Sequence, residues 1–186
     1  MPTIFTHAFV GAAVAQTLAP CTRRREVTVA SAVCAMVPDA DVLGFGFGIL
    51  YGDLFGHRGF THSLFFAGVV TLCAAAICWT QFTPAERLRT ILCVFAATAS
   101  HGLLDAFTNG GMGVAFWAPF SATRYFFPVT PIEVSPIGLG FFSQRGMSTL
   151  ASEMAWVWAP AACMILAARL TRCRRVEAPA NLAGVG

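Results

Sequence analysis

The chain contains no lysine and has little charge of either sign. Of its 186 residues, 12 are basic, all of them arginine, and nine are acidic, so charged residues make up 11% of the sequence. A nucleic-acid-binding surface needs a basic stripe on a soluble fold, whereas these arginines cluster at a few points. We therefore expect no nucleic-acid partner.

Paired cysteine motifs are also missing. The seven cysteines are odd in number and mostly embedded in apolar runs, and no CxxC pair occurs among Cys21, Cys34, Cys73, Cys78, Cys93, Cys163 and Cys173. This pattern argues against a zinc ribbon or a disulfide framework. The cysteines are expected to act as small apolar packing residues.

Apolar residues are present in excess. The hydrophobic fraction is 56%, the mean hydropathy is +0.68 and 17 residues are Phe, which is typical of integral membrane proteins. Five apolar segments approach the ~20 residues that cross a bilayer, at residues 3–20, 27–49, 61–82, 88–108 and 150–170. We predict an all-α, polytopic membrane helical bundle of about five apolar helices, forming a single domain over residues 1–170.

The regions around these segments have distinct compositions. The first segment resembles a signal peptide but has no basic residues before it, so we expect it to be retained, although it is short for a full span. Residues 109–146 are rich in Gly, Pro and aromatic residues and are expected to form an ordered loop with partial helices. Residues 171–186 are predicted to be a mobile cytoplasmic tail.

The arginines predict the orientation. They cluster at residues 23–25, at 87 and 89, and at 169–175, after the first, third and fifth segments. Five crossings place all three clusters on one side, which the positive-inside rule makes cytoplasmic. The N-terminus is then outside and the C-terminus inside.

In this predicted topology, all four histidines and three aspartates lie at a similar depth near the outer face of the membrane. Ionisable side chains within membrane segments are costly and usually functional. We therefore predict a metal site towards this face, with its candidate ligands being His7, Asp39, Asp41, His57, His62, His101 and Asp105.

Two motifs support this site. In HGLLD, His101 and Asp105 lie four residues apart on one helix face, a spacing that suits one metal ion or a simple hydrogen-bonded pair. In VPDADVLG, Pro38 interrupts helical hydrogen bonding before Asp39 and Asp41. Two carboxylates so close repel each other unless a cation or a proton lies between them; the alternative is a helix end with an Asp cap.

The HRGFTHS stretch contains half of the histidines. Thr61 is expected to cap a helix that begins at His62, and Gly59 permits the tight turn before it. The turn brings His57 and His62 together and holds Arg58 at the same rim, where it could neutralise an oxyanion. A capped interfacial helix with a snorkelling arginine would explain part of this stretch but neither histidine.

Imidazoles and carboxylates suit zinc, manganese or iron. Because seven ligands exceed the four of a tetrahedral site, we expect one to three divalent ions, with zinc favoured. Two ions with a bridging hydroxide would activate water near neutral pH and hold both the attacking and the leaving oxygen of an ester.

Together, the early His7, the PDAD element, HRGFTHS and HGLLD resemble the LexA-regulated, membrane-bound, predicted metal-dependent hydrolases of bacterial inner membranes. The similarity covers residues 1–125, and HRGFTHSL is its most specific part. It implies an inner-membrane location and metal-dependent hydrolase activity, with the seven His and Asp residues as the matching positions. The arrangement is more distantly similar to zinc-dependent phospholipase C, which suggests a phosphoester substrate.

We therefore expect a membrane-bound metal-dependent hydrolase that acts on a phosphoester or lipid-linked substrate through a metal-activated water. Asp39, His62 and Arg58 are the candidate catalytic residues, with Asp39 or His62 as general base. Arg58 and Arg124 are the candidate substrate-binding residues. The aromatic residues of 116–127 suit the headgroup interface, either as an anchor or as a guide for substrate.

Two other functions use the same residues. A divalent metal or proton transporter would place them near the membrane midplane, often between paired repeats, and the sequence indicates neither feature. A non-catalytic membrane protein would use metal only to fix helix packing. The sequence makes no prediction of oligomeric state.

Overall fold

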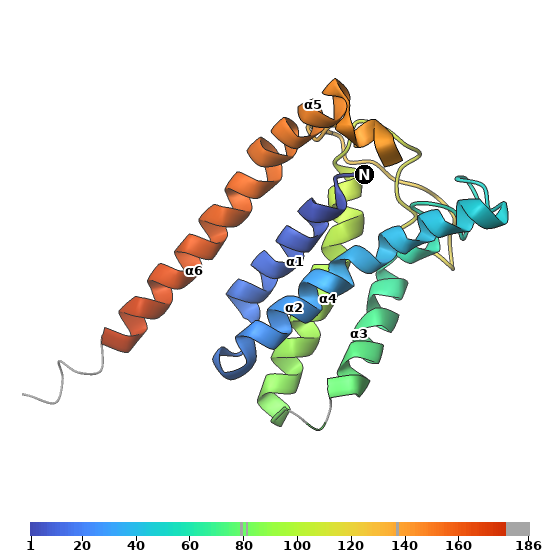
Figure 1. The fold of residues 1–186 in the computed structure, drawn as a ribbon. Coiled ribbons are helices and arrows are strands. Elements are labelled where there is room, and N and C mark those ends of the chain that lie inside the picture. The colour runs from blue at the N-terminus through green and yellow to red at the C-terminus, as the bar shows by residue number, and fades with distance from the viewer. Residues whose placement is uncertain (79, 81, 137, 178–186) are drawn as a thin grey trace, which may run out of the picture.

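The structure, a computed structural model, describes residues 1–78, 80, 82–136 and 138–177. Four helices form a bundle, and a fifth, long helical segment follows them (Figure 1). The bundle consists of α1 (Ile4–Leu18), α2 (Arg24–Met36), α3 (Leu64–Cys78) and α4 (Pro84–Ala106). The last segment consists of α5 (Gln144–Glu153), the π-helical η6 (Met154–Trp158) and α6 (Ala159–Glu177). Within the described residues, β pairing is confined to two isolated bridges, which agrees with the predicted all-α class.

The helix boundaries differ from the predicted spans where local chemistry intervenes. The second segment changes at Pro38 from α2 into the 3₁₀ helix η2 (Val37–Phe47), because proline removes a helical donor. The last segment continues to Glu177, so residues 171–177 of the predicted tail are helical, while residues 178–186 lie outside the described residues. Thr83 and Glu86 form a capping box at the start of α4.

Two helical segments have the length and apolar composition of membrane spans, Cys21–Phe47 and Gln144–Thr171. Two of the other predicted spans are shorter apolar helices, Ile4–Leu18 and Leu64–Ile77. At 15 residues, α1 and α3 are each about 22 Å long, which is less than the ~30 Å of a bilayer core.

The bundle has a small and partly polar interior and a large apolar exterior. Ala15, Ala35, Ser31 and Thr98 are buried, whereas many large apolar side chains are exposed, including Leu72, Ile77, Leu88, Leu92, Leu166 and Leu170. Small interior residues allow close helix packing in a bilayer, and a large apolar exterior is unfavourable in water. This distribution is the one expected of a lipid-facing bundle.

The start of α1, the start of α3 and the ends of α2 and α4 lie at the same end of the bundle (Figure 1). The 3₁₀ helix η1 (Cys21–Arg23) and the starts of α2 and α4, which carry Arg23–Arg25 and Arg87, lie at the other end. The connection from α2 to α3 contains the 3₁₀ helix η3 (Phe60–His62), and the one from α4 to α5 contains η5 (Gly138–Phe142). The predicted site residues therefore meet at the end of the bundle opposite these arginines.

The crossing of α1 and α2 provides a test of the packing. A Cβ atom at Gly11 would lie 2.6 Å from the carbonyl oxygen of Ser31 and 2.7 Å from the Cβ of Ala35. We expect Gly11→Ala to destabilise the protein by about 1–3 kcal/mol, measured as a lower thermal midpoint in detergent. The matched control is Gly68→Ala in α3, where a Cβ meets nothing within 4 Å; there the higher helix propensity of alanine should leave stability unchanged or raise it. Equal effects of the two substitutions would contradict the close crossing.

Candidate metal centre

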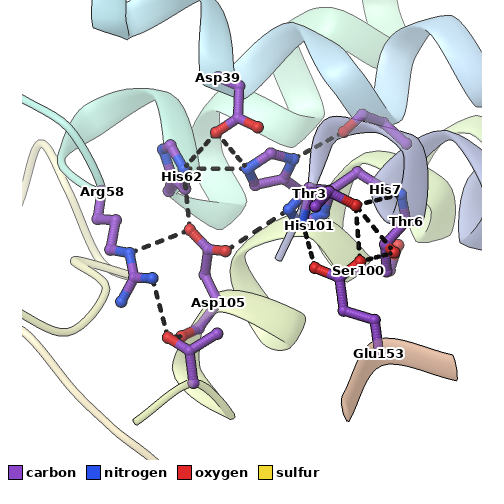
Figure 2. A network of polar contacts seen from close by, with 12 residues as sticks. Thr3, Thr6, His7, Asp39, Arg58, His62, Ser100, His101, Asp105 and Glu153 are labelled. Carbon is purple, nitrogen blue, oxygen red and sulfur yellow. Dashed lines mark hydrogen bonds and ion pairs between the residues drawn. The ribbon is translucent and has the colours of Figure 1, made fainter. Parts of the chain in front are cut away.

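The centre is built from residues at the ends of four elements. His101 lies near the end of α4, His62 ends η3, and Asp39 follows the break at Pro38. The Nε2 atoms of His62 and His101 are 3.0 Å apart. One Asp39 oxygen lies 3.3 Å from Nε2 of His101 and 3.7 Å from Nε2 of His62. Figure 2 shows the three side chains facing one another.

The backbone of α2 fixes the orientation of the His101 ring. Its Nδ1 lies 2.7 Å from the carbonyl oxygen of Ala35. Since a carbonyl can only accept, Nδ1 is a protonated nitrogen and donates this hydrogen bond, so Nε2 is the nitrogen that can bind a metal. A backbone acceptor in this position is the usual support of a metal-ligating histidine.

His7 and Asp105 complete this group. His7 is stacked on His101, with ring centroids 3.6 Å apart, and its Nε2 lies 3.6 Å from one oxygen of Asp105. The other oxygen of Asp105 lies 3.3 Å from Nε2 of His62. Both His7 and Asp105 are fully buried. Two α-helices and two 3₁₀ helices thus bring five donor side chains into one cluster.

Asp41 and His57 form an adjoining group. Nδ1 of His57 lies 2.7 Å from one oxygen of Asp41, and Nδ1 of His62 lies 3.2 Å from the other. The Thr61 hydroxyl donates to Asp41 at 2.6 Å. The expected capping role of Thr61 is therefore wrong: α3 begins at Leu64, and the Ser63 hydroxyl accepts from the Phe66 amide.

Several buried atoms at the centre lack hydrogen-bond partners. Among the described residues these include both nitrogens of His7 and both carboxylate oxygens of Asp39 and Asp105. Buried polar groups without partners are rare in folded proteins, and a bound ion is a common explanation. Imidazole nitrogens and carboxylate oxygens are borderline and hard donors that suit zinc, manganese or iron. The residues present therefore fit a divalent cation.

Three overlapping sets of three residues could hold such an ion. In each set, one ligand atom per residue lies within 4.8 Å of the others. The sets are His7, His101 and Asp105; Asp39, His62 and His101; and Asp41, His57 and His62. All seven predicted ligands thus come together, and His62 and His101 are shared between sets.

Arg58 lies directly behind Asp105. Its Nε is 3.2 Å from the Asp105 carboxylate, and the other guanidinium nitrogens donate to the Thr108 hydroxyl and the Gly110 carbonyl. The side chain is fully buried, and Arg58 has a φ of 63°. Left-handed backbone is uncommon for a residue other than glycine and is found at functional sites. Figure 2 shows Arg58 reaching Asp105 from the side away from His7.

Arg124 lies outside the cluster. Its guanidinium donates to the carbonyl oxygens of Tyr51, Asp53 and His57, so it holds the loop that carries His57. Partial burial lowers the pKa of Arg124, and burial raises the pKa of the Tyr51 phenol. This loop packs closely, since the Tyr51 ring meets the His57 ring edge-on.

Glu153 is a buried site residue that sequence reasoning missed. Its carboxylate accepts from the Thr3 amide at 2.5 Å and from the hydroxyls of Thr3 and Thr6 at 2.6 Å each. Trp158 also donates to the Thr6 hydroxyl. Because Thr6 precedes His7, Glu153 fixes the start of α1 at the centre. A carboxylate within an apolar segment was the available signal.

The chain was compared with known proteins. The family model described as YdjM inner membrane protein matches residues 1–176. The chain belongs to this family. It is 42% identical over 161 residues to the inner membrane protein YbcI of Escherichia coli strain K12, covering 86% of this chain and 92% of that protein. No solved structure matches.

Membership in the YdjM family confirms the predicted inner-membrane location. The exposed apolar side chains on the outside of the bundle therefore face lipid. The hydrolase activity that the HRGFTHSL resemblance implies is a finer statement than the family description and is taken up as a proposal below.

The Glu153 contacts predict a coupling between α5 and the centre. Glu153→Ala leaves a buried amide and two buried hydroxyls without their acceptor and should destabilise the protein by roughly 2–3 kcal/mol, measured by thermal unfolding in detergent. The half-buried Glu133 is the matched control, and Glu133→Ala should change stability by about 0.5 kcal/mol or less. If both variants unfold like the unsubstituted protein, Glu153 does not hold the start of α1.

Proposed function

We propose that this protein is a membrane-bound metal-dependent hydrolase that acts on a phosphoester or lipid-linked substrate. The observation that carries the proposal is the convergence of seven buried His and Asp side chains, among which the donor atoms of His7, Asp39 and Asp105 lack hydrogen-bond partners. The resemblance of HRGFTHSL to predicted metal-dependent hydrolases points the same way.

His7, Asp39, His62, His101 and Asp105 are the proposed ligands of a principal divalent ion, with zinc favoured. Asp41 and His57 either complete a second ion site with His62 or orient it: Asp41 accepts from the His62 ring on the side away from Asp39. Such a carboxylate–histidine pair fixes the ring and raises its basicity as a ligand.

A divalent metal held there would supply Lewis acidity and lower the pKa of a coordinated water. The chain's own groups provide the rest. Asp39 is slightly exposed, whereas Asp105 is enclosed, so Asp39 is the carboxylate that a substrate can approach and is the proposed general base. His62, which lies between three carboxylates, is the alternative general base if it does not bind the ion.

The arginine clusters support an orientation with the N-terminus outside, the C-terminus inside and the centre towards the periplasm. The elements that carry Arg23–Arg25 and Arg87, η1 and the starts of α2 and α4, lie at the end of the bundle opposite the centre (Figure 1), and such residues favour the cytoplasmic side.

A divalent metal or proton transporter would use the same residues. The hydrolase is favoured because the cluster lies at one end of the bundle (Figure 1), whereas transport sites usually lie near the midplane.

Metal analysis tests the proposal. Protein purified in detergent should contain at least about one zinc, manganese or iron ion per chain, and His101→Ala and Asp105→Ala should each lower the content to roughly a tenth or less. Asp53→Ala is the matched control, since Asp53 accepts from the Leu50 amide in a loop outside the three candidate sets. Wild-type protein without divalent metal would contradict the proposal.

Activity is measured on the same preparations. A screen of bis(p-nitrophenyl) phosphate, phospholipids and carboxyl esters should show turnover that the ligand variants lose and Asp53→Ala keeps. Zinc flux in proteoliposomes without any hydrolysis would favour the transporter, and tightly held metal with neither activity would favour a structural role.

A second experiment tests the role of Arg58. Because its guanidinium is enclosed beside Asp105, we propose that it positions this ligand. Arg58→Lys keeps the charge but loses the planar fork and should weaken metal affinity by about 10–100-fold, measured by chelator competition. Arg145→Lys is the control, since Arg145 is exposed on α5 and lies outside the three candidate sets, and it should leave metal affinity unchanged. A rise in KM for Arg58→Lys at unchanged metal affinity would instead assign Arg58 to the substrate.

A further inference from the structure

A pocket of about 300 Å³ lies between the start of α1, η2 and η5. Apolar side chains make most of its wall, among them Ile4 and Phe5 from α1, Val42 from η2, and Phe141 and Phe142 from η5. The rings of Phe5 and Phe141 are 6.5 Å apart, so two segments far apart in the sequence form one apolar wall.

One end of this pocket reaches the candidate metal centre. Asp39 lines the pocket, is only 5% exposed, and has no hydrogen bond to either carboxylate oxygen among the described residues. One of its oxygens faces His62 and His101, while the other is turned away from them (Figure 2). A ligand in the pocket would therefore have its polar group beside the centre.

The pocket is also lined by side chains that meet the surroundings of the bundle. Phe5 is 62% exposed and Phe142 is 84% exposed. Since the chain belongs to an inner-membrane family, exposed rings at the end of an apolar bundle lie against lipid or at the headgroup level. The pocket therefore connects the bilayer with the metal centre.

We propose that this pocket binds the acyl chain of a single-chain lipid, with the ester or phosphoester group of the lipid beside Asp39. The proposal rests on the proposed function and names its substrate class. A volume of about 300 Å³ equals roughly ten water-sized groups of about 30 Å³ each, which suits a chain of about ten methylenes. Ligand sites of this kind combine apolar walls with a few polar groups at one end.

The charge of the lipid headgroup distinguishes binding in the pocket from dependence on the metal. The Asp39 carboxylate attracts a cation and, without one, repels an anionic headgroup. A neutral monoacylglycerol should therefore enter the pocket with or without metal. A lysophosphatidic acid of the same chain length should bind well only to metal-loaded protein.

The test uses these two lipids, each with a ten-carbon chain that carries a diazirine near its end. Each probe is added to the full chain in phosphatidylcholine vesicles and cross-linked by light, and the labelled residues are identified by mass spectrometry. Saturable labelling by the neutral probe is expected at pocket residues, competed by unlabelled ten-carbon monoacylglycerol at least tenfold better than by glycerol.

Two matched valine variants separate the pocket from the general lipid-facing surface. Val42→Trp fills the pocket and should lower saturable labelling at least fivefold with metal content unchanged. Val29→Trp places the same side chain at an exposed position of α2 outside the pocket and should leave labelling unchanged. Labelling that does not saturate, or equal labelling of both variants, would overturn the pocket proposal.

The lysophosphatidic acid probe tests the role of the metal independently of the pocket. Chelation should reduce its labelling at least tenfold and leave the neutral probe unaffected. If the neutral probe labels the pocket but chelation changes neither probe, the pocket proposal stands and the proposed metal-dependent function fails. If the neutral probe does not label the pocket in protein of measured metal content, the pocket proposal fails alone.

Discussion

Desolvation of the carboxylates at the end of the bundle is the constraint on which the rest of the structure depends. Burial of an isolated carboxylate costs several kcal/mol even after relaxation, and Asp39 and Asp105 are both buried without hydrogen bonds to their oxygens. Arg58 pairs with one oxygen of Asp105, and the N-terminal ammonium also acts on this carboxylate. A cation among the facing imidazoles would satisfy both carboxylates at once, and for this reason the centre is more readily explained as a metal site than as a hydrogen-bonded network.

The supports around the centre are arranged to meet this constraint. Ala35 accepts from His101, and Asp41 holds His57 and His62. Glu153 fixes the start of α1, and Arg124 fixes the loop before η3. Each support comes from a different part of the chain. Small residues within the bundle, such as Gly11 and Ala35, allow the helices to approach closely enough for these contacts.

The apolar pocket provides a route by which a substrate could reach the centre. Its wall includes Asp39 of the centre and the exposed rings of Phe5 and Phe142. A buried, enclosed cluster would have no route for a substrate, whereas a pocket that opens towards lipid supplies one. The same arrangement explains why the centre lies at the end of the bundle, where a lipid can present its polar group without crossing the bilayer core.

The sequence by itself determined the helical class, the inner-membrane character and the meeting of seven His and Asp residues, because apolar length, arginine placement and residue type are local properties. It also located the break at Pro38. Only the tertiary structure decided the role of Thr61, which binds Asp41, the enclosure of Arg58 behind Asp105, and the part played by Glu153. It also decided the pocket, whose wall joins Phe5 to Phe141. These features depend on which distant segments pack together, and no spacing along the chain encodes that.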